Sequence, residues 1–329
     1  MSDPAITVRE LSKTFTSVKK QPGIAGSLRA LVSREKTLME AVKKVSFDIA
    51  PGELVGFLGP NGAGKTTTLK MLTGILHPTS GEARVLSYKP FDRRPELLRQ
   101  IALVMGNKNQ LWWDLPAWDS FVVLREIYGV DHKSFDRRME RLLSDLQLTD
   151  KVNTQVRKLS LGERMKCELV AALLHGPRVI FLDEPTIGLD LVSQKKIRDF
   201  LKELNRDEGS TMILTSHYMQ DVQELCERVI VIDHGTIIFD GTLDSLMQRY
   251  SDKRILRLRF SEEVSPDDLG KYGELNESED ESVAITVKRA DTSKVTAAVL
   301  ANLPVADIAI EEVSVEEVIR NLFAEAPPT

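Results

Sequence analysis

The stretch Gly59-Pro-Asn-Gly-Ala-Gly-Lys65-Thr66-Thr67 decides the fold of this chain, because it matches the pattern G-x-x-x-x-G-K-[ST] in the expected context. The apolar run 54–58 before it is typical of a buried strand, and residues 67–72 after it are typical of a helix start. Glycines let backbone N–H groups turn inward around phosphates, and the helix N-terminus adds positive potential. The segment therefore predicts a phosphate loop in an α/β domain.

The residue types in this loop indicate its chemistry. Lys65 can reach the β- and γ-phosphates of a nucleotide, and the Thr66 hydroxyl can hold Mg²⁺. The alternative, a glycine turn with a solvated lysine, fits poorly because motif and context agree. We expect nucleotide contacts along the whole loop: Gly59, Pro60, Asn61, Gly62, Ala63, Gly64, Lys65, Thr66 and Thr67.

Three further candidate residues follow apolar strands. Asp183 and Glu184 come after the run 179–182, at the carboxyl edge where α/β proteins bind ligands. We expect Asp183 to bind the metal and Glu184 to orient or deprotonate an attacking water; two solvated acids at a turn are the alternative. His217 ends the strand predicted at 212–216 and is a candidate γ-phosphate sensor, while a lone histidine is more often structural.

A helix start is marked by Ser160 and Glu163, which form a capping box before an apolar helix. Many helices begin in this way, so a structural interpretation is sufficient for the pair. The same helix N-terminus also attracts phosphate, which makes both residues candidate nucleotide contacts.

Length and composition predict a soluble protein of about two domains, with 329 residues, 42% hydrophobic and 28% charged. The net charge of −5 gives no reason to expect nucleic-acid binding. No apolar run approaches the roughly 18 residues that span a bilayer, and the N-terminus lacks the apolar core of a signal peptide. Cys167 and Cys226 lie outside any metal-binding pattern, so we expect buried free thiols. We therefore expect a cytoplasmic protein that reaches a membrane only through a partner.

The composition changes near residue 250, which predicts a nucleotide-binding domain at 1–248 and an accessory α+β domain at 249–329. The acidic stretch 275–282 predicts a loop. The other elements expected in the accessory domain are strands at 255–260, 282–287 and 307–313 and helices at 292–302 and 315–323.

Within the first domain, short strands are expected at 5–11 and 45–49 and a helical subdomain at about 110–175. Between the two strands lies a basic insertion at 16–40. It is either a solvated loop with one short amphipathic helix or a surface for anionic lipid or a membrane partner.

Five motifs then occur in one order: Gly59–Thr67, Leu159–Glu163, Phe181–Pro185, Gly188–Asp190 and Thr215–His217. Together they resemble the ATP-binding subunits of ABC transporters over residues 5–245. The chain looks most like the bacterial ABC-2 exporter type, in the branch with the segment Gln110–Pro116. The resemblance implies a P-loop ATPase with antiparallel β and helical subdomains, and ATP and Mg²⁺ as cofactors. It also implies a homodimer or heterodimer of ATPase subunits, held at the inner face of the cell membrane by permease subunits.

The resemblance also implies roles for individual residues. In a head-to-tail dimer with two ATP molecules, Ser160 and Gly162 of one subunit would close over the ATP bound to the other. Asp190 would lie at the dimer seam, and Phe15 would stack on adenine, the alternative being a core position for this ring. The signature here is Ser-Leu-Gly-Glu where Ser-Gly-Gly-Gln is commonest, and it keeps the serine and second glycine.

The family's metal-contacting glutamine is replaced here by Asn107, with Gln110 as the alternative for that role. All three tryptophans, Trp112, Trp113 and Trp118, follow within seven residues. Either they form a core beneath the helical subdomain, or Trp112 and Trp113 form a docking surface for the permease. In ABC transporters this neighbourhood receives the coupling helix of the membrane subunit.

Two other functions fit parts of the sequence. A soluble ABC ATPase acting on ribosomes or DNA would carry tandem domains or long coiled coils, whereas this chain has one phosphate loop and no sustained heptads. The ATPase of a polysaccharide exporter would have an all-β tail domain, whereas helical patterns occur here. The transported substrate is chosen by the permease and is not encoded in this chain.

Overall fold

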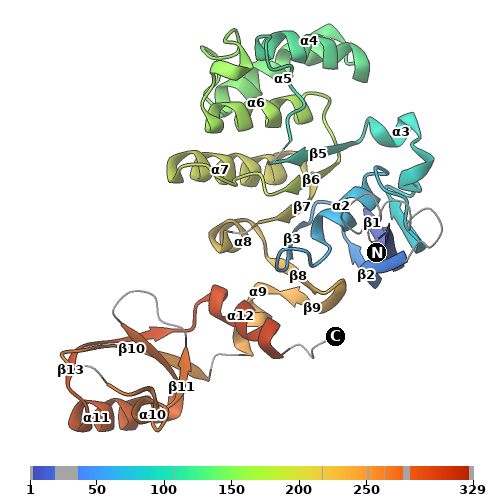
Figure 1. Cartoon of the computed structure of the whole chain (residues 1–329). Helices are drawn as coiled ribbons and strands as arrows, with labels where there is room; N and C mark the ends of the chain where they lie inside the picture. Colours follow the sequence, from blue (N-terminus) through green and yellow to red (C-terminus); the bar gives the residue numbers. More distant parts are fainter. Residues whose placement is uncertain are drawn as a thin grey trace, which may run out of the picture. The chain divides into compact units, whose positions relative to one another are not determined.

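The computed structural model of the chain describes residues 3–18, 36–106, 108–216, 218–249, 252–262, 264–276 and 282–325 (Figure 1). The fold separates into two compact units, which divide between Asp240 and Gly241. This division lies eight residues before the boundary expected from composition. Within the described ranges, no helix has both the length and the apolar character needed to cross a bilayer.

The first unit is built on a six-stranded sheet in the order β5-β6-β7-β3-β8-β9. Its strands are β3 (Leu54–Leu58), β5 (Ile101–Met105), β6 (Val179–Asp183), β7 (Thr211–Thr215), β8 (Arg228–Asp233) and β9 (Thr236–Thr242). The first five are parallel, and β3, β6 and β7 are buried at every position, as expected for strands covered on both faces. β8 and β9 are neighbours joined by a hairpin that turns at His234-Gly235.

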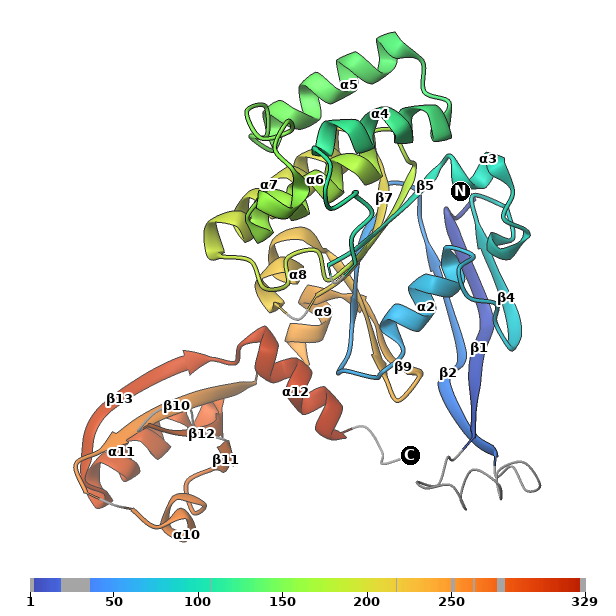
Figure 2. The ribbon, with the colours of Figure 1, turned by 45° about the horizontal axis from the view of Figure 1, so that its top comes forward.

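A second, antiparallel sheet has the order β2-β1-β4, formed by β1 (Ile6–Val18), β2 (Lys36–Ile49) and β4 (Ser80–Val85). The phosphate-loop helix α2 (Lys65–Leu72) lies between the two sheets (Figure 2), and both sheets contribute to the core around it. The first two strands are much longer than expected, because their pairing continues to Val18 and Lys36. The ends of the expected insertion 16–40 are therefore strand, and its centre, 19–35, lies outside the described residues.

On the other face of the six-stranded sheet lie α6 (Leu161–Leu173), α7 (Leu191–Glu208) and α8 (Met219–Leu225), while α4 (Ala117–Tyr128) and α5 (His132–Asp145) pack on α6. Figure 1 shows α4, α5 and α6 grouped together as a helical subdomain, which confirms the α/β fold class with its two subdomains. The short helices η1 (Pro90–Asp92), α3 (Pro95–Leu98) and η2 (Val156–Lys158) connect these elements. Cys167 on α6 and Cys226 after α8 are both buried and free, as predicted.

The second unit has a four-stranded antiparallel sheet in the order β11-β12-β10-β13. Its elements are α9 (Leu243–Gln248), β10 (Lys253–Phe260), α10 (Pro266–Leu269), β11 (Glu274–Asn276), β12 (Val283–Lys288), η3 (Arg289–Asp291), α11 (Thr292–Asn302), β13 (Val305–Glu312) and α12 (Val315–Glu325). The loop expected at 275–282 is wrong at its start, because Leu275 and Asn276 pair with β12. A three-residue strand is too short to show a period, and the same holds for α10.

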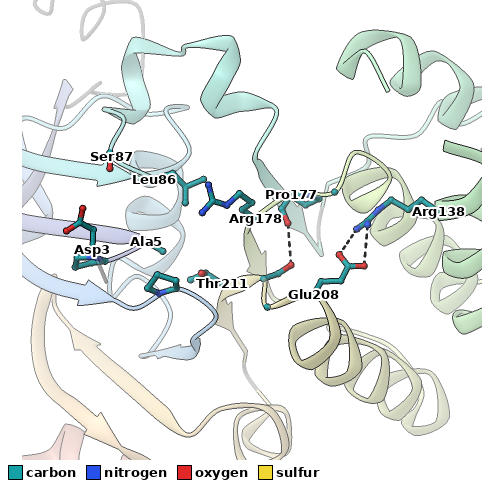
Figure 3. Close-up of a pocket in the computed structure, with 14 residues that line it drawn as sticks. Asp3, Ala5, Leu86, Ser87, Arg138, Pro177, Arg178, Glu208 and Thr211 are labelled. Carbon is teal, nitrogen blue, oxygen red and sulfur yellow. Dashed lines mark hydrogen bonds and ion pairs between the residues drawn. The ribbon is translucent and has the colours of Figure 1, made fainter. Parts of the chain in front are cut away.

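A pocket of about 330 Å³ opens at the amino ends of β6 and β7 (Figure 3). There Arg138 of α5 forms an ion pair of 2.9 Å with Glu208 of α7, and its Nε donates to the carbonyl of Leu173 at 2.6 Å. These contacts attach the helical subdomain to α7. Ligands of α/β sheets bind at the carboxyl ends of the strands, so this pocket lies at the opposite edge from the phosphate loop.

Candidate functional site

The phosphate loop lies at the carboxyl end of β3, and its backbone is fixed by contacts that leave no room for side chains. A Cβ on Gly59 would lie 2.2 Å from the carbonyl oxygen of Ile232. Gly64 has a φ of +110°, and a Cβ there would lie 2.5 Å from the carbonyl oxygen of Ala41. These two glycines therefore hold the loop close to β8 and β2, while Pro60, Asn61 and Gly62 at its tip are exposed.

Lys65 is the first residue of α2 and is 6% exposed. Its Nζ donates hydrogen bonds to the carbonyls of Gly59 at 2.6 Å and Pro60 at 3.0 Å, so the ammonium group lies inside the loop. Burial lowers the pKa of Lys65, while the nearby carboxylates of Glu184 and Asp183 act in the opposite direction. A cation held in this way is placed to bind phosphate oxygens.

The candidate metal ligands Thr66 and Asp183 lie side by side. The Thr66 hydroxyl donates to the Asp183 carboxylate, with distances of 2.9 and 3.1 Å to its two oxygens. The described residues contain no cluster of three or more His, Cys, Asp or Glu side chains that could hold a metal by themselves. One hydroxyl and one carboxylate fit Mg²⁺, which usually completes its octahedron with phosphate oxygens and water.

Glu184 is held in an unusual backbone conformation, with a φ of +56°. Its N–H donates to both the carbonyl oxygen and the hydroxyl of Thr215, at 3.0 and 3.1 Å. From the other side, the N–H of Gly106 donates to the Asp183 carbonyl at 2.9 Å, and a Cβ on Gly106 would lie 2.2 Å from the Glu184 carbonyl oxygen. The ends of β5 and β7 therefore hold the Glu184 backbone in place. Strained backbone of this kind is commonest at functional sites.

Thr215, which the sequence marks only as the first residue of the motif Thr215–His217, joins these parts through its hydroxyl. It donates to Asp183 Oδ1 at 2.8 Å while accepting the Glu184 N–H. A second buried network lies beside it, where Asp221 accepts from Ser216 at 2.6 Å and pairs with Arg198 at 3.0 Å. Sequence reasoning missed Arg198 and Asp221, because charges spaced over two helices give no local signal.

The signature residues form a separate group at the N-termini of α6 and α7. The predicted capping box is confirmed, with Ser160 and Glu163 exchanging hydrogen bonds of 2.9 and 3.2 Å. Asp190 caps α7 by accepting the Ser193 N–H at 2.9 Å, and hydrogen bonds from Ser193 lower the pKa of its carboxyl. A Cβ on Gly162 would lie 2.5 Å from the Ser193 hydroxyl, so the two helix starts are in close contact.

The surface around these helix starts is apolar and open. Leu161, Leu191 and Val192 are 38%, 76% and 66% exposed. Figure 2 places α6 and α2 on opposite faces of the six-stranded sheet. A single chain thus carries two groups of expected nucleotide contacts, the phosphate loop and the signature. Within that chain the two groups lie apart.

Of the remaining candidate residues, the structure describes Phe15 and Gln110. Phe15 is a half-buried ring on β1, with Lys13 Nζ 5.3 Å from its centre. Asn107 and His217 lie outside the described residues. The Gln110 amide donates to the carbonyl of Leu103 at 3.0 Å, so this side chain is bound to β5.

The core alternative holds for one of the three tryptophans. Trp118 is half-buried and meets the ring of Phe135 edge-on at 6.0 Å, which is a core contact. Trp112 and Trp113 are 46% and 45% exposed, so the core interpretation is wrong for them.

A groove of about 580 Å³ lies next to this segment, between η1, α3, β5 and α4. Its lining includes Ile75 and Ile127, which are 56% and 64% exposed, and three basic side chains, Arg93, Arg99 and Lys108, with no acidic one among the described lining residues. Sequence reasoning missed this groove, because its lining is drawn from stretches at 73–75, 93–105, 108–110 and 127–128, and no one of them marks a groove.

Two family models match the chain: "ABC transporter" at residues 42–187 and "EvrA-like ABC transporter, C-terminal domain" at residues 252–311. The ABC transporter ATP-binding protein NatA of Bacillus subtilis (strain 168) is 36% identical over 214 residues, which is 65% of this chain and 87% of NatA. The linearmycin resistance ATP-binding protein LnrL of the same organism is 34% identical over 220 residues, 67% of this chain and 70% of LnrL. A solved ATP-binding subunit of an ABC transporter has a TM-score of 0.63 and 24% identity, covering 75% of this chain and 93% of that one.

The network around Thr215 gives a testable prediction. Thr215→Val keeps the shape of the side chain and removes the hydroxyl shared by Asp183 and Glu184. We expect ATP affinity near that of the unchanged protein and turnover at least about tenfold lower, a loss that needs only about 1.4 kcal/mol. Thr215→Ser, which restores the hydroxyl, is the matched control. Calorimetric ATP binding and steady-state phosphate release measure both quantities, and full turnover in a folded Thr215→Val protein would contradict the role.

Proposed function

Because this chain belongs to the ATP-binding subunits of ABC transporters, which are ATPases, we propose that it powers an exporter of the ABC-2 type through a permease on another chain. The single observation that carries the catalytic part is the cluster of Thr66, Asp183 and Thr215 beside the phosphate loop. The exporter type is supported by the relative named for linearmycin resistance and by the match of the second unit to an ABC transporter C-terminal domain. That unit contains α11 and α12, which favours this function over a polysaccharide exporter with an all-β tail.

For catalysis, the phosphate loop and Lys65 bind the phosphates, and Thr66 with Asp183 would hold Mg²⁺. A magnesium ion supplies charge neutralisation for the transferred phosphoryl group when bound. Glu184 orients the attacking water or takes up its proton, and the buried hydrogen bonds of Thr215 fix the direction in which Glu184 leaves β6. Asn107 and His217 are proposed to contact the metal and the γ-phosphate.

We further propose that two chains close head to tail over two ATP molecules. The proposal is supported by the positions of α2, which follows the phosphate loop, and α6, which begins at the signature, on opposite faces of the sheet. It is also supported by Leu191 and Val192, whose exposure beside Asp190 is expected of residues that a second subunit covers. In this arrangement the positive end of the α6 dipole faces the partner's γ-phosphate.

The permease is proposed to dock in the groove beside β5 and against Trp112 and Trp113. An apolar floor with exposed isoleucines fits an amphipathic helix, and the basic rim of Arg93, Arg99 and Lys108 favours acidic residues on its flanks. Rings that are nearly half exposed can gain contact area without disturbing the core.

The role of Glu184 is tested by Glu184→Gln. The amide keeps the size of the side chain and cannot accept the proton of the attacking water, so we expect ATP binding with most turnover lost. ATP should then accumulate a dimer that size-exclusion chromatography with light scattering detects. A variant that hydrolyses ATP at the unchanged rate would remove Glu184 from the mechanism.

Sites shared between subunits are tested by mixing two inactive variants. Ser160→Arg blocks the signature, and Lys65→Ala removes a charge-assisted phosphate contact. A mixed dimer has one site with both defects and one site with neither, so mixing should recover part of the ATPase activity. If each chain held its own complete site, the mixture would stay as inactive as its components.

The docking surface is tested by Trp112→Ala with Trp113→Ala. Loss of an interface tryptophan costs about 2 kcal/mol or more, roughly thirtyfold in affinity, so the variant should be released from membranes that contain the permease. Because both rings are nearly half exposed and lie outside the core, its thermal unfolding should stay near that of the unchanged protein. Trp118→Ala is the control and should lower the unfolding temperature, since Trp118 packs on Phe135. A double variant that stays on the membrane and still supports transport would refute the docking role.

A further inference from the structure

A buried carboxylate in the middle of the signature helix has no part in the site described so far. Glu168 on α6 is 2% exposed, and its oxygens accept the N–H of Gln110 at 2.9 and 3.1 Å and the N–H of Leu111 at 3.3 Å. Burial raises the pKa of Glu168, while these hydrogen bonds and the charge of Arg164 lower it. A buried acid is a costly way to fill a core position, and an apolar side chain of similar size often serves stability equally well.

The partners of Glu168 begin the segment Gln110–Leu115, which carries the two exposed tryptophans. Farther along this segment, the ring of Trp113 lies under the Arg164 guanidinium of α6, whose Cζ is 5.1 Å from the ring centre. The N–H of Arg157 donates to the Trp113 carbonyl at 3.0 Å, and the N–H of Val156 donates to the Leu115 carbonyl at the same distance. The segment is thus attached along its length to α6 and to the turn η2 just before it.

The two residues of α6 that make these contacts are regularly spaced with the signature serine. Ser160, Arg164 and Glu168 follow one another at intervals of four, so they lie along one side of α6. Ser160 stands at the end proposed to meet the partner's ATP, and Glu168 stands two turns away at the loop that leaves β5.

We propose that Glu168 is a positioning residue that fixes the segment Gln110–Leu115 to the signature helix, so that Ser160, Trp112 and Trp113 move as one body. Movement of the signature on ATP binding is then transmitted to the tryptophans through the hydrogen bonds of one carboxylate and the Arg164–Trp113 contact. The consequence for the permease rests on the proposed docking function; the attachment itself does not.

The chain contains its own probe for this attachment, because its three tryptophans all lie between residues 112 and 118. A Trp118→Phe background leaves only the two exposed rings as reporters. In the full chain, acrylamide quenching of tryptophan fluorescence is measured with and without Mg-ATP, together with ATP affinity. We expect a clear ATP-linked change in quenching in this background.

Two substitutions at Glu168 separate the oxygen acceptor from the size of the side chain. Glu168→Gln keeps one oxygen that can accept both N–H groups, and it should retain the ATP-linked change. Glu168→Leu removes the acceptor, and it should lose that change while ATP affinity stays the same. The matched control is Lys166→Met: Lys166 is also buried on α6, but its Nζ donates to the Leu146 carbonyl at 3.1 Å, away from the segment. It should behave like the background protein.

Arg164→Met provides a second route if Glu168→Leu does not fold, since the Arg164 side chain is half-buried and its removal opens no cavity in the core. It should weaken the ATP-linked change by removing the Trp113 contact. The proposal is overturned if the background protein shows no ATP-linked change. It is also overturned if Glu168→Leu or Arg164→Met leaves that change intact, or if Lys166→Met abolishes it equally. Loss of the ATP-linked change in Glu168→Leu would support the attachment. Normal transport by the Trp112 and Trp113 double variant would refute the docking function while leaving the attachment supported.

Discussion

The geometry of the site depends on the hydrogen bonds that the Asp183 carboxylate accepts from Thr66 and Thr215. These three side chains come from α2, β6 and β7, and they meet because parallel strands present their carboxyl ends at one edge of the sheet. The same contacts fix the conformation of the Glu184 backbone, because its N–H donates a hydrogen bond to the Thr215 hydroxyl. The phosphate loop therefore does not stand alone: the strand order β6-β7-β3 brings the Thr66 hydroxyl, the Asp183 carboxylate and Glu184 to one place.

The division of the expected contacts between two faces of the sheet has a simple cause. Helix α2 is sandwiched between the two sheets, whereas α6 belongs to the layer on the far side. A chain folded in this way presents its own signature outward. In the proposed dimer a second subunit would supply the missing half and would cover the apolar, exposed edge at Leu191 and Val192.

The features that could be predicted from the sequence are local ones. Three such features each occupy fewer than ten consecutive residues: the phosphate loop, the capping box at Ser160 and the buried strand before Asp183. Residue types and their spacing are enough to predict them. Contacts between distant segments could not be predicted. In the sequence Glu168 is a single acid in an apolar helix, and only the structure shows that it accepts the N–H of Gln110. The same holds for the pair Arg198–Asp221 and for the exposure of Trp112, which depends on how the helical subdomain covers the sheet. Short elements such as α10 and β11 lack the length to show a period.

The two buried thiols have a practical consequence. Burial raises the pKa of Cys167 to about 12 and raises that of Cys226 as well, so neither side chain is a reactive thiolate near neutral pH. A maleimide or a thiol-reactive spin label would therefore not react with either native cysteine in the folded protein. Cysteines introduced on the surface can be labelled selectively without first removing the native ones, and distances between labelled subunits can be followed through the ATP cycle in an otherwise unaltered chain.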